Sequence, residues 1–283
     1  MKSLKESLAK ALFICAACIS ILAVALICVF LFVNGIPGMA KIGVWDFLSG
    51  TRWKPGNDIY GILPMILGSV YVTAGALIIG VPAGLLTAVF LSRFASKRLA
   101  KLVRPAVSLL AGIPSVVFGF FGLVVIVPMV RQLFGGSGFS LIAACILLGM
   151  MILPTIITVS ESALNAVPPN YYEGALALGA THERAVFRVV LPAARSGVMA
   201  AVILGVGRAV GEAMAVMMVA GNRAVIPESL FAGVRTLTSN IVMEMGYAAD
   251  LHREALIATA VVLFVFIMII NLLFSVIKRK AKI

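Results

Sequence analysis

The chain has 283 residues, of which 62% are hydrophobic and only 12% are charged, and its mean hydropathy is +1.13. This composition excludes an ordinary soluble domain and predicts an all-α, polytopic membrane protein. The formal net charge of +12 indicates no nucleic-acid partner, because the basic residues form short clusters between apolar runs, where membrane orientation explains them better.

Six apolar segments are long enough to cross the core of a lipid bilayer, which takes about 20 residues. They cover residues 11–33, 60–91, 106–130, 140–160, 197–221 and 255–277, so we expect about six transmembrane helices. The first run is longer than the apolar part of a signal peptide, and no good cleavage site follows it. We therefore expect residues 1–59 to form an uncleaved N-terminal anchor helix followed by an external loop.

Lysine and arginine are divided unevenly between the two sets of connections. Fifteen of the 23 lie in the two termini, in the second connection and in the central connection, whereas seven lie in the remaining connections. The positive-inside rule then predicts that both termini and the central connection are cytoplasmic. On the opposite side, Trp45 and Trp53 are expected to anchor the first external loop at the level of the lipid headgroups.

The third segment contains several helix-breaking residues: Gly112, Pro114, Gly119 and Gly122. Breaks at membrane depth are tolerated where the backbone is buried in protein or lines a wet cavity. Small residues also let two helices pack closely. The sequence leaves both interpretations open.

The central connection from Pro168 to Pro192 is a polar segment between two apolar ones. Proline fits the first turn of a helix, so Pro168 and Pro169 can open one. Gly179 can close that helix as a left-handed C-cap, and Thr181 can cap a second short helix. The first helix carries more apolar surface than a solvated loop should, from Tyr171, Tyr172, Leu176 and Leu178, and we expect something to cover it.

This connection contains a recognisable spacing. Glu173, Gly174 and Ala175 are followed after three residues by Gly179, after nine more by Val189, and after one more by Leu191 and Pro192. The spacing resembles the EAA motif of ABC importer permeases, with mild departures at Gly174 and Val189. Further stretches, including LLAGIPSVVFGFFGL and GRAVGEAMAVMMVAGN, are similar to the PstC family of phosphate importer permeases.

The resemblance implies a type I ABC importer permease fold over residues 60–283, with a cytoplasmic coupling loop at 161–196, in a prokaryotic cytoplasmic membrane. It implies four partner subunits: a homologous PstA-like permease, two PstB-like cytoplasmic ATPases and an extracytoplasmic PstS-like phosphate-binding protein. The coupling residues would be Glu173, Gly174, Ala175, Gly179, Leu191 and Pro192. The sequence has no G-x-x-x-x-G-K-[ST] run, so this chain is expected to be no ATPase and to bind no cofactor, with ATP and magnesium used by the ATPase subunits.

Arg208 and Glu212 lie near the middle of the fifth segment, where a charge costs roughly 2.5–3.5 kcal/mol on insertion scales. With a spacing of four residues, they are expected to share one helix face, bracketed by Gly207 and Gly211. Guanidinium suits phosphate oxygens, so Arg208 would contact the translocating anion, and Glu212 would pair with it when the site is empty. The alternative is a purely structural ion pair.

Other functions remain open. The chain could be the PstA-like partner permease or a permease for another oxyanion such as sulfate or molybdate. The run MAVMMVAGN after Glu212 favours the PstC family. An intramembrane enzyme or a passive channel is the third possibility, although the latter would need no docking segment. We expect no catalytic and no metal site, and assign no role to His182 and His252, because neither has a neighbour at ligand spacing.

Overall fold

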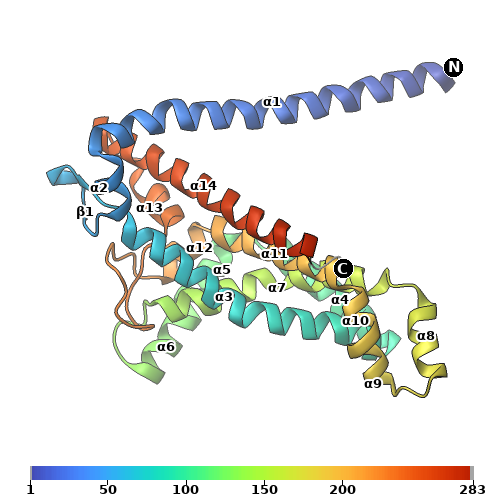
Figure 1. Ribbon diagram of the computed structural model, residues 1–283. Helices are drawn as coiled ribbons and strands as arrows, with labels where there is room; N and C mark the ends of the chain where they lie inside the picture. Colours follow the sequence, from blue (N-terminus) through green and yellow to red (C-terminus); the bar gives the residue numbers. More distant parts are fainter. Residues whose placement is uncertain (1, 281–283) are drawn as a thin grey trace.

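The computed structural model describes residues 2–280, with side chains from Glu6 to Val276. Apart from one short hairpin, the described chain consists of helices and connecting loops (Figure 1). Five helices are long and apolar enough to cross a membrane, or six if one sharply bent pair is a single span. The all-α, polytopic architecture is therefore confirmed.

The N-terminal helix α1 runs from Lys2 to Ile42 and diverges from the rest of the molecule toward its N-terminal end (Figure 1). The expectation that the anchor ends at residue 33 is wrong, since the helix continues through Pro37. The reason is close packing on α14 (Asp250–Lys280). A Cβ at Gly38 would lie 2.7 Å from the Cβ of Glu254, so the glycine allows a contact between helices that offsets its poor helix propensity.

A compact unit follows α1. It consists of α2 (Val44–Ser49), strands β1 (Trp53–Lys54) and β2 (Ile59–Tyr60), and the intervening 3₁₀ turn η1 (Pro55–Asn57). The strands are antiparallel, with Trp53 opposite Tyr60. This end of the molecule is called the hairpin end below. It has its own hydrophobic cluster, centred on Phe47, Trp53, Ile62, Leu237 and Leu256.

The centre of the molecule is the pair α3 (Leu63–Val89) and α7 (Leu141–Asn165). Glycines let their backbones approach, since a Cβ at Gly80 would lie 2.7 Å from the side chain of Ile152, and one at Gly84 would lie 2.8 Å from that of Ile156. The main hydrophobic cluster surrounds this contact. A five-residue π-helix, η2 (Phe90–Phe94), continues α3.

The third apolar segment is divided differently from the predicted 106–130. An amphipathic helix, α4 (Lys97–Gly112), ends at an extended break at Ile113 and Pro114. The crossing helix comprises α5 (Ser115–Phe121), η3 (Gly122–Ile126, a π-helix) and α6 (Val127–Phe134). The break follows from Pro114, because the residue before a proline is pushed out of the α region.

Two of the glycines in this segment pack against α12 (Met214–Val219). A Cβ at Gly119 would lie 2.6 Å from the Met218 sulfur, and one at Gly122 would lie 2.7 Å from the Val219 side chain. A Cβ placed on Gly112 would have no atom of the described residues within 4 Å beyond the helix's own backbone. For Gly119 and Gly122, the structure therefore supports close helix packing.

The fifth predicted segment is also broken. Helix α11 (Arg195–Gly211) ends before Glu212, which is extended, and α12 begins two residues later. A loop then leads to α13 (Leu237–Glu244) and α14.

The remaining short helices form the central loop, residues 161–196, at the end opposite the hairpin (Figure 1). They are α8 (Pro169–Ala177), α9 (His182–Ala185), the π-helix η4 (Val186–Val190) and α10 (Leu191–Ala193). The N-terminal part of α1 points toward this end as well (Figure 1).

Candidate functional site

The first helix of the central loop, α8, ends in a glycine C-cap as predicted. Gly179 has a φ of +84°. Its N–H donates to the Leu176 carbonyl at 2.9 Å, and the Ala180 N–H donates to the Ala175 carbonyl at 3.1 Å. These two bonds form a Schellman motif, which satisfies carbonyls that the helix end would otherwise leave unpaired.

The second helix starts as the sequence predicts. The Thr181 hydroxyl accepts from the Arg184 backbone N–H at 3.3 Å. Glu183, in the first turn of α9, has its pKa lowered by backbone N–H groups and by the Thr181 hydroxyl. A carboxylate is favoured at this helix end, because the positive end of the helix dipole lies there.

The apolar surface expected on α8 is exposed. Leu178 is 91% exposed and Tyr171 is 52% exposed. Of the motif residues, Glu173 and Gly174 are exposed and Ala175 is half-buried. Among the described residues, no atom beyond the backbone of α8 itself lies within 4 Å of a Cβ placed on Gly174. The motif residues on α8 thus form an open surface rather than an enclosed pocket.

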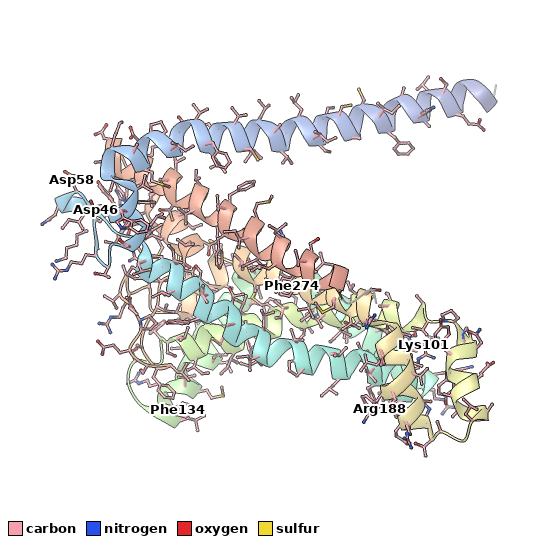
Figure 2. The ribbon with its side chains drawn as sticks, in the orientation of Figure 1. Asp46, Asp58, Lys101, Phe134, Arg188 and Phe274 are labelled. Carbon is pink, nitrogen blue, oxygen red and sulfur yellow. The ribbon has the colours of Figure 1, made fainter. Side chains whose placement is uncertain are left out.

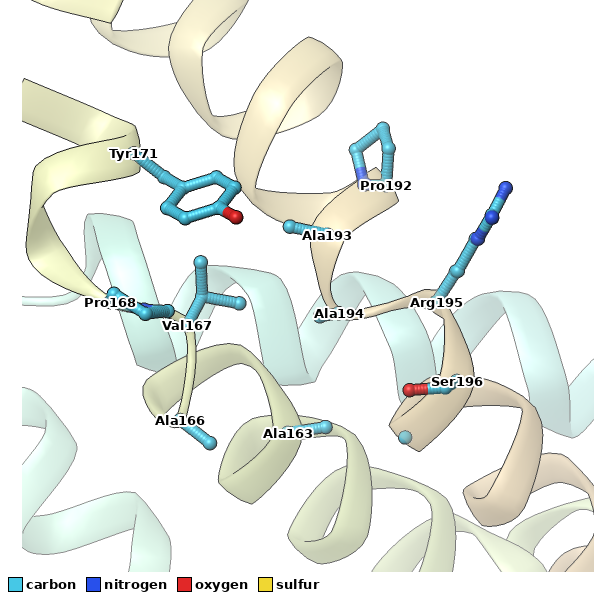
Figure 3. Close-up of a pocket in the computed structure, with 11 residues that line it drawn as sticks. Ala163, Ala166, Val167, Pro168, Tyr171, Pro192, Ala193, Ala194, Arg195 and Ser196 are labelled. Atoms are coloured by element: carbon cyan, nitrogen blue, oxygen red, sulfur yellow. The ribbon is translucent and has the colours of Figure 1, made fainter. Parts of the chain in front are cut away.

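In the other half of the motif, Pro192 lines a cavity beside α8 (Figure 3). The cavity has a volume of about 660 Å³ and is lined mainly by small residues from the end of α7 and the start of α11. Tyr171 and Pro192 line opposite sides of it (Figure 3). Of the motif residues, Pro192 alone lines this cavity, and the lining residue from α8, Tyr171, lies outside the motif.

Proline also explains the π-helix η4. Pro192 has no N–H, so it cannot donate to the carbonyl of Arg188 four residues earlier, and the backbone adopts the wider π spacing just before it. The same relation recurs at η3, which directly precedes Val127 and Pro128.

His182, to which the sequence assigned no role, joins the two short helices of the central loop. Its Nδ1 lies 2.7 Å from the Tyr172 hydroxyl. Its ring also meets Phe94 of η2 edge-on, with 4.6 Å between ring centroids. The η2 segment is in turn tied to the end of α7, because Arg93 donates to the Leu164 carbonyl at 2.6 Å. His182 thereby connects α8 to the cytoplasmic ends expected for α3 and α7.

The expected one-face arrangement of Arg208 and Glu212 is wrong. Because α11 ends at Gly211, Glu212 leaves the helix, and its Oε1 accepts from the Ala215 backbone N–H at 3.0 Å, capping α12. Among the described residues, Arg208 pairs with no carboxylate. Its Nη1 donates to the Thr155 hydroxyl on α7 at 3.5 Å. A cap at the start of α12 thus replaces the predicted ion pair.

The face of α11 around Arg208 is open. Gly207 and Gly211 are exposed, and among the described residues no atom beyond the helix's own backbone lies within 4 Å of a Cβ placed on either. Arg208 itself is half-buried. In the described part of the chain, the Arg208 guanidinium therefore lies beside a helix face that Gly207 and Gly211 leave without side chains.

A buried polar network at the hairpin end escaped the sequence interpretation. Glu244, only 6% exposed, accepts from Arg235 at 2.7 Å and from the Trp53 indole at 2.8 Å. Its other contact is His252, whose Nε2 lies 2.8 Å from Oε2. Trp53 is 8% exposed and serves this network, so the predicted headgroup anchor is wrong for Trp53, whereas Trp45 is 79% exposed.

Tyr60 completes the aromatic side of this network, stacking on His252 with 6.1 Å between ring centroids. Burial, together with a hydrogen bond to the Asp58 carboxylate, raises the pKa of Tyr60 to about 12. The phenol thus stays protonated and donates to Asp58 at 3.1 Å. Only the tertiary structure brings these residues together, because they come from β1, β2, α13 and α14.

Among solved structures, the fold is similar to that of permeases of bacterial ABC transporters. A chain of a bacterial alginate ABC transporter, solved with an alginate-bound periplasmic protein, matches with a TM-score of 0.63 and 16% identity, over 93% of this chain and 94% of that one. A chain of the MetNI methionine ABC transporter, in inward-facing conformations, matches with a TM-score of 0.59 and 24% identity, over 79% and 95%.

Two relatives in sequence are closer. The "Probable ABC transporter permease protein YqgH" of Bacillus subtilis (strain 168) is 41% identical over 270 residues, covering 92% of this chain and 87% of the relative. The "Phosphate transport system permease protein PstC" of Mesorhizobium japonicum is 34% identical over 261 residues, covering 85% and 80%.

The family described as "Binding-protein-dependent transport system inner membrane component" matches residues 80–283. That range holds α4 to α14, the central loop with its motif, and Arg208. The family is the membrane component of such a transport system and not its ATPase. The chain therefore belongs to the binding-protein-dependent ABC transporter permeases, as a multi-pass inner membrane protein.

Proposed function

We propose that this chain is a PstC-like permease subunit of an ATP-driven phosphate importer, forming half of the translocation pathway. The observation that carries the proposal is Arg208. Its guanidinium lies in the membrane-spanning part of the chain beside an open helix face, with a 3.5 Å contact to Thr155 and no carboxylate partner among the described residues. A permanent positive charge at membrane depth needs an anion, and guanidinium matches phosphate geometry.

The substrate assignment draws on relatives. Several curated proteins named as PstC phosphate permeases are 33–34% identical to this chain. The relative at 41% identity carries a name without a substrate. For this reason, transport of another oxyanion such as sulfate or molybdate is one alternative. The PstA-like partner role is the other.

Glu212 takes a different part from the one that the sequence suggested. Since it caps α12, it keeps its negative charge bound to a helix start and directed away from pairing with Arg208. Arg208 is then free to contact the anion directly.

The central loop is the ATPase contact in this proposal. The exposed α8, with Glu173, Gly174 and Ala175, docks on a PstB-like ATPase, as amphipathic helices dock in grooves. Gly179 sets the turn after α8, and Pro192, which follows Leu191, lines the cavity beside it. ATP and magnesium act in the two ATPase subunits, and closure of their dimer moves α8 and, through His182, the ends of α3 and α7.

The remaining partners follow from this arrangement. A PstA-like permease forms the other half of the pathway, and a PstS-like binding protein delivers phosphate at the hairpin end. Both termini then lie in the cytoplasm, at the end of the molecule that carries the central loop.

The test is uptake of labelled phosphate by cells that lack this chain and by the same cells with the chain restored. Unlabelled phosphate, sulfate and molybdate are added as competitors. We expect restored uptake that only phosphate suppresses. Suppression by sulfate or molybdate would replace the substrate, and an absence of restored phosphate uptake would overturn the proposal.

A further inference from the structure

A second polar cavity lies at the junction of α3 and α4. It has a volume of about 460 Å³, and its lining comes from the end of α3 with η2 and from the first half of α4. Its polar side chains are Ser92, Lys97, Lys101 and Arg104. This size lies within the roughly 300–1,000 Å³ range of ligand pockets. The motif and the pathway described above do not include it.

The three cations of this cavity share one face of α4. Lys97, Lys101 and Arg104 have the spacing i, i+4, i+7, which places side chains above one another on a helix. Lys97 is also the first residue of a 16-residue helix, where the positive end of the helix dipole adds to its charge. The lining thus concentrates positive potential at one point.

Arg104 is held in place by an ion pair with α7. Its Nε and Nη2 each lie 2.7 Å from Oε1 of Glu161, a carboxylate on α7 that is only 8% exposed. This contact uses part of the guanidinium, which has five N–H donors, and leaves the rest available. Glu161 thereby fixes the arginine without filling its donor capacity.

The charge of the cavity is not balanced within the described chain. No acidic residue lines it. Neither Lys97 nor Lys101 has an ion-pair partner among the residues whose side chains the structure describes, whereas Arg104 shares Glu161. Two ammonium groups in one cavity repel each other unless an anion lies between them.

The cavity lies at the depth of lipid headgroups. The continuous helix from Leu63 to Phe94 has 32 residues and is about 48 Å long, which exceeds the roughly 30 Å hydrocarbon core. Leu91 and Ser92, in its last turn, therefore belong to the headgroup layer. Lys101 and Arg188 of the central loop both lie toward the end of the molecule opposite the hairpin (Figure 2).

Apolar surface continues from the cavity in both directions. On α4, Leu102 and Leu109 are each 73% exposed. On α3, Leu86 and Phe90 are exposed one turn apart, just before the lining residues. A ligand at this position meets cations at one end and an apolar surface at the other, as an amphipathic helix at a membrane interface provides.

We propose that this cavity binds the phosphodiester headgroup of an anionic phospholipid, with its acyl chains along the exposed apolar residues of α3 and α4. Basic pockets beside membrane helices recognise anionic headgroups in this way. The adjacent apolar surface favours a lipid over free phosphate. This inference does not depend on phosphate being the transported substrate.

The experiment uses the assembled importer, reconstituted in vesicles of phosphatidylcholine alone or of equal parts phosphatidylcholine and phosphatidylglycerol. After extraction into mild detergent, native mass spectrometry counts the lipids that stay bound. The test variant is K97Q/K101Q. The control K10Q/R98Q has the same change of charge, and neither of its residues lines the cavity. K97R/K101R keeps both charges.

We expect wild type, K10Q/R98Q and K97R/K101R to retain phosphatidylglycerol, and K97Q/K101Q to retain it about tenfold less. Equal retention by K97Q/K101Q, or no preference of the wild type for phosphatidylglycerol over phosphatidylcholine, would overturn the proposal. Loss of the ATPase subunits from K97Q/K101Q with lipid retained would instead assign the cavity to that partner.

A separate arm distinguishes lipid from free phosphate. Acylation of Lys97 and Lys101 is followed by peptide mass spectrometry in phosphatidylcholine vesicles, with and without inorganic phosphate, and in vesicles that also contain phosphatidylglycerol. We expect phosphatidylglycerol, and not inorganic phosphate, to protect the two lysines. Protection by inorganic phosphate alone would overturn the lipid assignment in favour of the free anion.

Discussion

At the scale of single residues, the two intramembrane charges have different roles. Glu212 caps α12, whereas Arg208 keeps a donor-rich side chain with one long contact to Thr155. An arginine that only held helices together would be expected to have a closer, fully paired partner. Arg208 and Glu212 therefore do not form the ion pair that their spacing in the sequence predicts.

Replacing Arg208 by alanine is expected to lower phosphate uptake about tenfold to a hundredfold, because a hydrogen bond to a charged group contributes about 1.5–3 kcal/mol. The complex should still assemble. Uptake and copurification of the ATPase subunits are measured together, with Arg131→Ala, an exposed arginine of α6, as the control. Failed assembly would assign Arg208 a structural role instead.

Glu244 offers the residue-scale prediction on stability. It accepts hydrogen bonds from Arg235 and Trp53 and contacts His252 while almost fully buried. Glu244→Ala leaves the Arg235 charge unpaired, and breaking a buried pair in this way costs about 3–5 kcal/mol. We expect a clear fall in the thermal unfolding midpoint of the purified complex.

The matched control for this change is Glu254→Ala. Glu254 pairs with Lys41 at 2.6 Å, but the Lys41 side chain is 59% exposed and that of Glu254 is 32% exposed, so the loss should be about 0–1 kcal/mol. Equal effects of the two substitutions on thermal unfolding would contradict the structural role of Glu244.

At the scale of elements, glycine and proline decide where helices end. Gly179 closes α8, Pro114 separates α4 from α5, and Pro192 lies in the first turn of α10, directly after the π-helix η4. The two glycines of the motif have different backbone environments. Gly179 has a left-handed backbone, whereas Gly174 lies within a regular helix and faces open space.

These differences predict opposite results for alanine at the two glycines. Gly179→Ala forces a Cβ into the left-handed region, at roughly 1–2 kcal/mol, and should loosen the turn and reduce uptake. Gly174→Ala should stabilise α8 by roughly 0.5–1 kcal/mol and leave uptake unchanged. Uptake at matched membrane abundance checks both. Impaired uptake in Gly174→Ala would show that the docking partner needs a glycine there.

At the scale of the whole molecule, function depends on surfaces that a single chain leaves uncovered. The apolar face of α8 and the glycine face of α11 lie on different elements and are both exposed. His182 and η2 connect α8 mechanically to the ends of the two central helices. A subunit that docks on α8 can therefore act on the bundle as a unit.

This arrangement predicts that Glu173→Lys uncouples transport. Glu173 is exposed on α8, and reversing its charge should disturb the ATPase contact without unfolding the chain. Uptake should fall strongly while membrane abundance stays normal. Glu228→Lys, with the same charge change on an exposed loop before α13, is the control, and normal uptake in Glu173→Lys would refute the docking role of α8.

The sequence by itself determined the class of the protein, the positions of its main apolar segments, the helix–turn–helix of the central loop and the motif within it. These features depend on local chemistry: hydrophobic length, a glycine in the left-handed region, a threonine cap and a fixed spacing. Local rules of this kind act within a few residues, so they can be recognised without knowing what packs against them.

Only the tertiary structure decided the rest. Whether Glu212 continues a helix or caps the next one depends on the packing of α11 and α12, and whether Trp53 meets lipid or Glu244 depends on a residue 191 positions away. His182 and Tyr172 meet across the turn that Gly179 makes. Contacts between distant parts of the chain have no periodic signal in the sequence, because their energy arises only once the backbone has folded.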